Sequence, residues 1–385
     1  MRSTDLSCLS IAIVVGTRPE LIKMAPVYLA LKAEPRVRVT LIATAQHREM
    51  LDQACSAFGI VPDIDLDLMR PDQGLSDIAA SVIAGVQRVL VEMRPDAVLV
   101  HGDTSTCLFS ALAAFYESIP VGHVEAGLRT YNFVAPWPEE MNRRLADPIS
   151  RWCFAPTERA ADNLRQEHIP ELNIFVTGNT IVDALLMARD DVRRNRPAVP
   201  GLLEELLDGQ RLILVTGHRR ESFGEPFRQF CIALKDVVER HPDTVLVYPV
   251  HLNPNVQRPV HNILGGQDRI QLIAPVEYLQ FIYLLDCCHF VITDSGGIQE
   301  EAPSLGKPVL VTRETTERSE AVAMGVAKLV GTSRKRIVCE ASRLLDDERS
   351  YAAMSAGVNP YGDGHASERI VDALLSTLPA DSQAV

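Results

Sequence analysis

Short motifs in this sequence bring carboxylates to places where they could exchange protons with a ligand. Asp103 stands in His-Gly-Asp-Thr, and Glu125 stands in His-Val-Glu-Ala-Gly. Glu139 and Glu140 follow Pro-Trp-Pro at an expected helix start, where acidic residues are also ordinary partners of the helix dipole. Carboxylates that face one crevice can divide into a general acid and a general base, because their environments separate their pKa values. Asp103, Glu125 and Glu139 are therefore candidates for acid–base catalysis.

The cations predict an anionic ligand, although the chain as a whole is acidic. Fifty acidic residues against 38 basic ones give a formal charge of -12, which argues against nucleic acid and anionic membranes as main partners. A phosphorylated ligand would need a local cluster of cations. The candidates are Arg18 with Lys23, the run His218-Arg219-Arg220, and Arg313 with Arg318. A charge run is usually a solvated face, but the run at 218 follows an expected strand, which favours phosphate binding.

Two glycine-containing turns follow expected strands and could receive a diphosphate. Gly16-Thr-Arg-Pro-Glu20 places Arg18 at a helix N-terminus, and Asp294-Ser-Gly-Gly297 precedes a second helix. Glycines and free backbone N–H groups let a diphosphate approach closely, and Glu300 or Glu301 could accept hydrogen bonds from a ribose. The alternatives are a plain strand-to-helix junction and a Ser or Asp cap without a ligand. Neither turn has the GxGxxG or P-loop pattern.

The elements that must position these residues follow from an alternation along the chain. Short β-branched runs alternate with longer segments of helical periodicity, which predicts an α/β fold with a mostly parallel, doubly wound sheet in each half. In such sheets ligands bind beyond the carboxyl ends of the strands, where the motifs above lie. The expected strands are Ile11–Val15, Val39–Ala43, Ala97–His101, Pro120–Val124, Ile174–Val176, Leu212–Thr216, Val245–Tyr248, Ile270–Ile273, Phe290–Thr293 and Val309–Thr312.

The length and composition fit a two-domain soluble protein. A chain of 385 residues with 46% hydrophobic residues exceeds one ordinary core. We expect Rossmann-like domains at 1–190 and 200–364, and a C-terminal segment at 365–385 whose helix could pack back on the first domain. The eight cysteines form no CxxC or Cys/His cluster, so neither a zinc site nor a disulfide framework is expected. With no signal-peptide pattern and no apolar run of about 20 residues, we expect a cytoplasmic protein.

Beyond these features, the chain resembles the bacterial non-hydrolysing UDP-N-acetylglucosamine 2-epimerases over about residues 11 to 375. The matching blocks are GTRPE at 16–20, QHREMLDQ at 46–53, HGDTST at 101–106, HVEAGLRT at 123–130, PWPEE at 136–140, TGHRRESFG at 216–224, YPVHLNPNV at 248–256 and DSGGIQEEAPSLGKPVLV at 294–311. Ser319, Asn132 and Val276 depart from the residues common in the family. These departures concern local contacts rather than the chemistry.

The resemblance implies a glycosyltransferase-B-like arrangement of the two domains around a cleft, and a homodimer. It implies interconversion of UDP-GlcNAc and UDP-ManNAc without NAD or a metal, by elimination of UDP to a 2-acetamidoglucal and re-addition, for cell-surface polysaccharide precursors. It makes Asp103, Glu125 and Glu139 the acid–base carboxylates and His218 an essential histidine. It assigns UDP-sugar contacts to Arg18, Lys23, Phe281, Ser295, Gly296, Gly297, Glu301 and Arg318. A second UDP-GlcNAc, acting as an activator, would meet Gln46, His47, Gln73, Arg219 and His251.

Three other functions stay open at this point. A glycosyltransferase of the same architecture would share the UDP site but pass the sugar to an acceptor, and a hydrolysing epimerase would release free ManNAc. A UDP-sugar sensor would keep the pocket and lack turnover. The acid–base carboxylates and His218 speak against the sensor, because binding alone does not need them.

Overall fold

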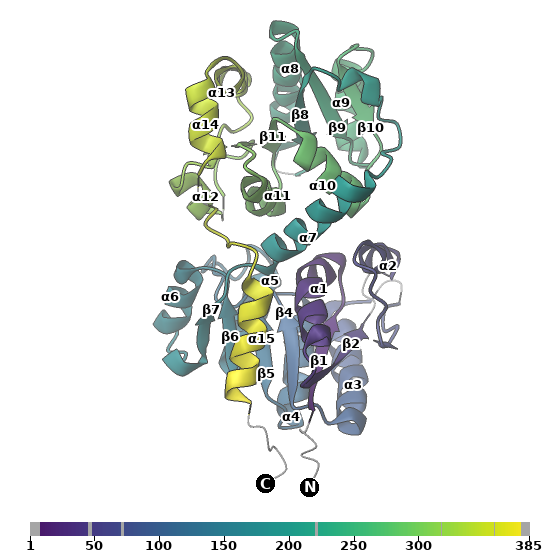
Figure 1. Ribbon diagram of the computed structural model, residues 1–385, viewed down its shortest axis with the longest axis vertical. Coiled ribbons are helices and arrows are strands. Elements are labelled where there is room, and N and C mark those ends of the chain that lie inside the picture. Colours follow the sequence, from purple (N-terminus) through teal and green to yellow (C-terminus); the bar gives the residue numbers. More distant parts are fainter. Residues whose placement is uncertain are drawn as a thin grey trace. The chain divides into compact units, whose positions relative to one another are not determined.

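The computed structural model describes residues 8–44, 48–70, 73–219, 222–316, 318–357 and 359–378. The chain divides into two compact units, unit 1 with Met1–Met187 and Tyr361–Val385, and unit 2 with Ala188–Pro360. Each unit contains its own parallel sheet flanked by helices (Figure 1). The predicted α/β class with two doubly wound, Rossmann-like sheets is confirmed.

Unit 1 is built on a seven-stranded sheet in the order β3-β2-β1-β4-β5-β6-β7. Its strands are β1 Leu9–Val15, β2 Val37–Ala43, β3 Ile64–Asp65, β4 Ala97–His101, β5 Val121–Val124, β6 Trp152–Ala155 and β7 Ile174–Val176. Its helices are α1 Arg18–Ala33, α2 Arg48–Ala57, α3 Leu75–Met93, α4 Ser105–Tyr116, α5 Glu139–Ala146, η1 Asp147–Ile149, α6 Glu158–Gln166, η2 Glu171–Asn173 and α15 Ala366–Thr377, together with the first part of α7 Thr180–Asn195.

Unit 2 carries a six-stranded sheet in the order β10-β9-β8-β11-β12-β13. Its strands are β8 Arg211–Thr216, β9 Thr244–Pro249, β10 Ile270–Ile273, β11 Phe290–Thr293, β12 Val309–Val311 and β13 Ala327–Leu329. Its helices are η3 Glu204–Leu206, α8 Glu225–Arg240, α9 Pro254–Leu264, α10 Tyr278–Cys287, α11 Gly296–Glu301, η5 Ala302–Leu305, α12 Ser319–Ala323, α13 Arg334–Asp346 and α14 Glu348–Ser355.

The central strands are buried along their whole length and mostly apolar, because helices cover both faces of each sheet. All seven residues of β1 and all five of β4 are buried. Strands buried on both faces read as continuous apolar runs rather than as alternating ones. This explains why β1 and β4 could be found from the sequence.

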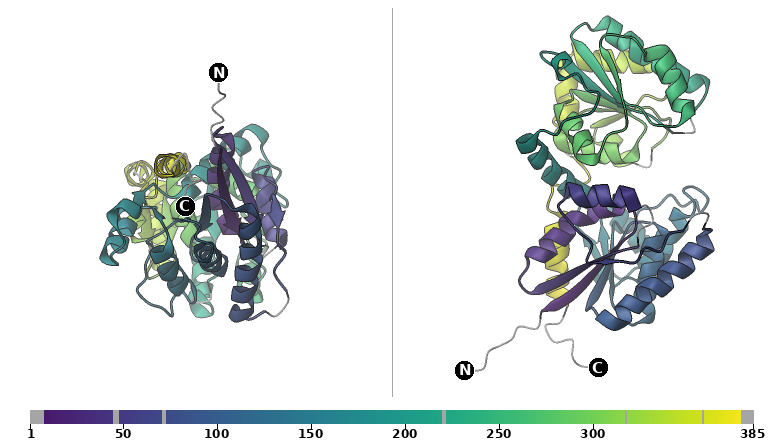
Figure 2. Two further views of the ribbon diagram at one scale, coloured as in Figure 1. Left: turned by 90° about the horizontal axis from the view of Figure 1, so that it is seen from below. Right: turned by 90° about the vertical axis from the view of Figure 1, so that its right-hand side faces the viewer.

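The last helix of the chain belongs to unit 1, although unit 2 precedes it in the sequence. Helix α15, drawn in yellow, lies beside α1 (Figure 2). The indole Nε1 of Trp152 donates to Thr377 Oγ1 at 2.7 Å. At the other end of the helix, Asp183 Oδ1 accepts from the backbone N–H of Ser367 at 2.8 Å. These contacts tie the C-terminal helix to β6 and to α7 of unit 1.

Each sheet reverses its strand order once, and the candidate residues follow the strands at that point. In unit 1 the reversal lies between β1 and β4, which precede Arg18 and Asp103. In unit 2 it lies between β8 and β11, which precede His218 and Ser295. Ligands of open α/β sheets bind at such reversals. The topology therefore predicts that ligands bind at these two sheet edges.

No helix in the described part of the chain is both long and apolar enough to span a bilayer. Among the same residues, no three His, Cys, Asp or Glu side chains are grouped so that they could hold a metal ion.

Candidate active site

Asp103 lies in the tight turn between β4 and α4. Gly102 precedes it with a φ of 70°, a conformation that glycine adopts without steric cost. The carbonyl oxygen of Asp103 accepts from Asn142 Nδ2 at 2.9 Å, and its carboxylate forms an ion pair with Arg143. Its side chain remains 30% exposed. The carboxylate is therefore fixed in place, paired with a cation and accessible.

Glu125 lies at the end of the neighbouring strand, β5. Its φ of 67° falls in the left-handed region, which non-glycine residues adopt at a cost and which often marks functional sites. The carboxylate forms an ion pair with Lys23 of α1 and accepts from Asn179 Nδ2 at 3.2 Å. Lys23, which the resemblance assigned to the UDP-sugar, thus contacts a candidate acid–base group.

A buried histidine lies beside this ion pair. His101 Nε2 is 3.8 Å from Glu125 Oε2. Burial lowers the pKa of His101 to about 3, although the Glu125 carboxylate raises it. Neither ring nitrogen has a hydrogen-bond partner among the described residues. His101 is therefore neutral at neutral pH, and the positive charge next to Glu125 belongs to Lys23.

Glu139 and Glu140 are adjacent at the start of α5 but differ in their surroundings. Glu140 is fully buried, and its carboxylate accepts from the backbone N–H groups of Thr130 at 3.0 Å and Tyr131 at 2.9 Å. Glu139 is partly exposed, and its carboxylate has no hydrogen bond or ion pair within the described residues. Glu140 holds the preceding loop, whereas Glu139 can act on a ligand.

The turn after β1 is organised by its own glutamate. Thr17 and Glu20 form a capping box, in which Glu20 Oε2 accepts from the backbone N–H groups of Gly16 at 3.0 Å and Thr17 at 2.7 Å. Thr104 Oγ1 donates to the other oxygen, Glu20 Oε1, at 2.5 Å. These N–H groups are not available to a diphosphate. The part of this turn that can still meet an anion is the partly exposed side chain of Arg18.

In unit 2, Asp294 joins the ends of β8 and β11. Its Oδ2 accepts from the backbone N–H groups of His218 at 2.7 Å and Arg219 at 2.8 Å, and Arg219 Nε donates to its carbonyl oxygen at 2.9 Å. The side chain of His218 is 46% exposed. Burial lowers the pKa of His218, although Asp294 raises it. Backbone hydrogen bonds thus position a histidine that is mainly neutral at neutral pH.

A cavity of about 190 Å³ lies over this edge of the sheet. It is lined by Thr216, Gly217, His218, Pro249, His251, Pro275, Val276, Phe281, Ser295 and Ile298. The rings of His218 and His251 are stacked, with centroids 5.2 Å apart. The cavity thus brings together His218, Phe281 and Ser295, predicted for catalysis or UDP-sugar binding, with His251, predicted for the activator.

The glycine turn after β11 leaves room for a ligand. Ser295 is the N-cap of α11, but its side chain makes no capping hydrogen bond. A Cβ atom placed on Gly297 would meet no atom within 4 Å. Farther along, Arg318 Nε donates to Glu300 Oε1 at 2.9 Å, and Glu301 is buried. The serine hydroxyl and the space above Gly297 are the features here that could receive a phosphate.

The sequence matches the family model for UDP-N-acetylglucosamine 2-epimerase over residues 29–375. The chain belongs to this family. A curated UDP-N-acetylglucosamine 2-epimerase of Escherichia coli K12 is 54% identical over 364 residues, which cover 94% of this chain and 97% of that protein. Its counterpart in Campylobacter jejuni is 49% identical over 371 residues, which cover 95% and 97%.

Two solved structures of UDP-GlcNAc 2-epimerases share the fold. The enzyme of Neisseria meningitidis, bound to UDP-GlcNAc, is 46% identical with a TM-score of 0.84, and the match covers 96% of this chain and 100% of that one. The enzyme of Methanocaldococcus jannaschii, in complex with UDP-GlcNAc and UDP, is 31% identical with a TM-score of 0.76 and the same coverage.

The residues predicted for an activator lie in different parts of the chain. Gln46 and His47 lie outside the described residues. Gln73 belongs to unit 1, where its Oε1 accepts from the backbone N–H of Arg70 at 2.8 Å. Arg219 and His251 belong to unit 2, where His251 lines the same cavity as His218.

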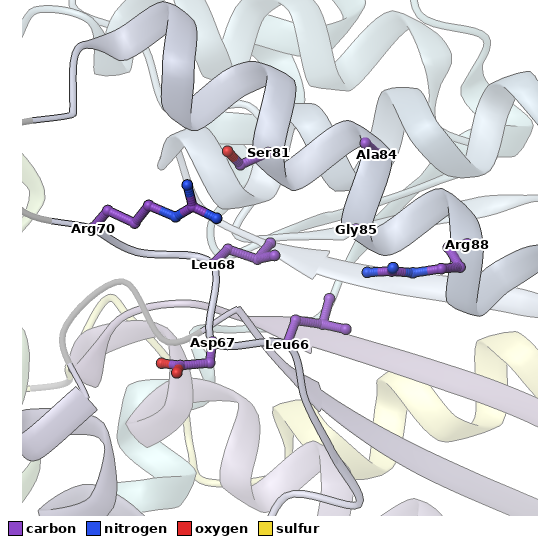
Figure 3. Close-up of a pocket in the computed structure, with 8 residues that line it drawn as sticks. All are labelled: Leu66, Asp67, Leu68, Arg70, Ser81, Ala84, Gly85 and Arg88. Atoms are coloured by element: carbon purple, nitrogen blue, oxygen red, sulfur yellow. The ribbon is translucent and has the colours of Figure 1, made fainter.

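A second cavity, of about 380 Å³, lies in unit 1 between α3 and the segment after β3 (Figure 3). Arg70 and Arg88 extend into it from opposite sides, with Leu68 and Gly85 between them (Figure 3). None of the predicted site residues lines this cavity. It is separate from the carboxylate edge described above.

The residues that hold Asp103 and Glu125 in place could not be identified from the motifs alone. Arg143 pairs with Asp103, and Asn179 donates to Glu125, from positions 40 and 54 residues away. No local pattern marks Asn179. Arg143 could have been suspected, because it lies one helical turn after Glu139 and so on the same face of α5.

Proposed function

We propose that this enzyme interconverts UDP-N-acetylglucosamine and UDP-N-acetylmannosamine by losing and regaining UDP. Family membership supports the substrate, because relatives with this name cover nearly the whole chain. The observation that carries the chemistry is the pair of carboxylates that follow neighbouring strands, Asp103 beside Arg143 and Glu125 beside Lys23. A cation beside a carboxylate favours its ionised form, which is the form that can accept a proton.

The first half of the reaction removes UDP. The C2 proton of the sugar is not next to a carbonyl, so its direct removal would leave an unsupported carbanion. As the C1–O bond breaks, the bonding pair leaves with UDP, and the growing positive charge at C1 acidifies the C2 proton. A carboxylate of unit 1 takes that proton, and the C2–H electrons become the C1–C2 double bond of 2-acetamidoglucal.

The second half reverses these steps on the other face of the sugar. A protonated carboxyl gives its proton to C2, and the diphosphate oxygen attacks C1. Because one proton leaves and one returns, no net oxidation occurs. The three candidates, Asp103, Glu125 and Glu139, supply the acid and base groups that two faces require.

Unit 2 supplies the groups that receive the leaving diphosphate. His218 can donate a hydrogen bond from its ring, and Ser295 can donate from its hydroxyl. Preorganised donors aimed at developing negative charge stabilise a transition state strongly. Phe281, which lines the same cavity, offers an aromatic face to the uracil.

Incubation of the pure protein with UDP-GlcNAc in deuterated water tests the proposal. We expect UDP-ManNAc that carries deuterium at C2, with UDP-GlcNAc labelled at the same carbon as the reaction approaches equilibrium. Free ManNAc as the main product would identify a hydrolysing enzyme. An unlabelled sugar that is consumed only when an acceptor is added would identify a glycosyltransferase.

We further propose that a second UDP-GlcNAc activates the enzyme through His251. The ring of His251 stacks on that of His218, so a ligand beside one histidine changes the surroundings of the other. The expected result is a lag when UDP-ManNAc is the only substrate, which a trace of UDP-GlcNAc removes. A linear onset without UDP-GlcNAc would contradict the activator.

We also propose a homodimer and a reducing, cytoplasmic location. Exposed apolar side chains on α3 and α4, Val91, Phe115 and Tyr116, support an interface there, and all eight cysteines are free. Sedimentation should give twice the chain mass, and Phe115→Glu should lower it. We propose that its product serves the synthesis of cell-surface polysaccharide precursors, so that deletion of the gene should reduce a ManNAc-containing polymer.

A further inference from the structure

A buried histidine lies directly beneath the Asp103 turn and takes no part in the reaction proposed above. His123 is completely buried in the middle of β5. Its Nε2 lies 2.7 Å from the carbonyl oxygen of Gly102, and its Nδ1 lies 2.6 Å from Asp147 Oδ1. Both ring nitrogens therefore have a partner, and one of these partners is the residue before Asp103.

These two contacts determine where the protons of the ring are. A carbonyl oxygen can only accept, so Nε2 carries a proton. An ionised carboxylate can also only accept, so Nδ1 carries the other proton, and the ring is an imidazolium. Burial opposes this charge, but Cys107 and Asp147 raise the pKa of His123 well above its ordinary value. Burial also raises the pKa of Cys107, so its thiol is neutral and Asp147 is the anion that matters.

The charge on His123 is compensated within the fold. Although burial raises it, the pKa of Asp147 is lowered by His123 and by Arg129, which donates to its other oxygen at 2.5 Å. Arg129 in turn donates to Glu167 at 2.7 Å. The side chains of His123, Asp147 and Arg129 thus form a fully buried chain of alternating charge, and Glu167 at its partly exposed end also pairs with Arg144. The titratable groups around His123 are Asp147 from η1, Cys107 from α4, His101 from β4 and Arg129 from the segment after β5.

We propose that His123 is a positioning residue, a permanently protonated imidazolium that holds the Gly102–Asp103 turn so that the Asp103 carboxylate meets C2 of the sugar. This inference rests on the proposed function, because it gives Asp103 a proton to move. Three further side chains restrain the turn, namely Cys107 Sγ on the Gly102 carbonyl at 3.3 Å, Asn142 on the Asp103 carbonyl, and Arg143 on the carboxylate. Two side chains donate to the Gly102 carbonyl oxygen, Cys107 and His123, and of these His123 is the charged one.

Two substitutions of His123 test the contacts of its two ring nitrogens separately. In His123→Gln the amide nitrogen lies near the former Nε2 and can still donate to Gly102. In His123→Asn it lies near the former Nδ1, so the contact with Asp147 can persist while Gly102 is released. A displacement of about 1 Å can lower a rate about 100-fold. We expect kcat of the Asn variant to fall about 100-fold and that of the Gln variant about 10-fold or less, with KM within about threefold in both.

The control is His241→Asn in unit 2, which removes another buried histidine. Its kcat should stay within about threefold of the parent enzyme. Equal losses of kcat in the two His123 variants, or a change in KM that exceeds the change in kcat, would show that His123 does not position Asp103.

Nitrogen-15 NMR of the unmodified enzyme tests the protonation state without any substitution. Both ring nitrogens of His123 should be protonated at about pH 7.5, where an ordinary histidine with a pKa of about 6.5 is mostly neutral, because each nitrogen faces an oxygen that can only accept. A neutral His123 ring at this pH would overturn the imidazolium.

The outcomes also separate this inference from the proposed function. If the parent enzyme does not epimerise UDP-GlcNAc, the proposed function fails whatever the NMR spectrum shows. If the parent enzyme is active and Asp103→Asn is inactive, but His123→Asn is fully active, the positioning role alone fails.

Discussion

The candidate edges of the two units are built in different ways. In unit 1, Asp103 and Glu125 are each paired with a cation, and a buried chain of charges lies behind them. In unit 2, His218 is half-exposed and mainly neutral, its backbone N–H is held by Asp294, and its ring stacks on that of His251. A group that must take up and return a proton needs a fixed position and a defined charge. A group that receives a diphosphate needs open space and donors, which the turn at Gly297 provides.

This difference predicts where substitutions reduce activity most. Asp103→Asn keeps the shape of the side chain but cannot exchange a proton, so kcat should fall about 10²- to 10⁴-fold with little change in melting temperature. His218→Ala removes a donor and should lower kcat by about 10²- to 10³-fold. Steady-state kinetics on folded variants measure both.

The matched control for Asp103 is Asp162→Asn on α6, whose side chain is 62% exposed. It should behave as the parent enzyme does. Near-normal rates in both Asp103→Asn and His218→Ala would remove the distinction between a proton-transfer edge and a diphosphate edge.

Adjacent glutamates on α5 sharpen the comparison within unit 1. Glu139→Gln should lower kcat about 10²-fold without a loss of stability, because its carboxylate has no partner among the described residues. Glu140→Gln should lower the free energy of unfolding by about 1–3 kcal/mol, because it weakens the acceptors for two backbone N–H groups. Its kcat should change only severalfold. Urea unfolding and steady-state kinetics on both variants measure these effects. A stability loss in Glu139→Gln together with a large kcat loss in Glu140→Gln would contradict the assignment.

The neutral state of the buried His101 in unit 1 predicts that the stability of the fold depends on pH. With a pKa of about 3 in the folded protein, His101 binds fewer protons than the unfolded chain does between about pH 3 and pH 6.5. The free energy of unfolding therefore rises with pH in this window and falls on acidification, by about 2 kcal/mol from pH 6.5 to pH 5.

Urea unfolding at these two pH values, on the parent enzyme and on His101→Gln, measures this contribution. The variant should lose less stability on acidification by about 2 kcal/mol. If both proteins lose the same amount, His101 is not held neutral by burial.

Much of the fold could be predicted because most of its strands are rich in β-branched, apolar residues. All ten expected strands are present within two residues of their predicted bounds. Three strands were missed, for physical reasons. Strand β6, Trp-Cys-Phe-Ala, and strand β13, Ala-Lys-Leu, lack β-branched residues. Strand β3 has two residues, too few for a periodic pattern.

The candidate site could be predicted only in part. Residues that follow strands, such as Asp103 and Ser295, were found because parallel sheets place ligands there. The turn after β1 shows the limit, since its backbone N–H groups are occupied by Glu20 rather than open to a phosphate. Contacts such as His123 with Asp147 join distant elements, and no local spacing reports them.

The central claim is that the C1–O bond breaks and re-forms while unit 1 moves the C2 proton. UDP-GlcNAc labelled with oxygen-18 in the bridge between C1 and the β-phosphate tests it directly. After partial turnover, released UDP can rotate its β-phosphate before it returns. We predict that the label becomes distributed between bridging and non-bridging positions of the recovered UDP-sugar. Complete retention of the label in the bridge, alongside formation of UDP-ManNAc, would contradict the elimination route.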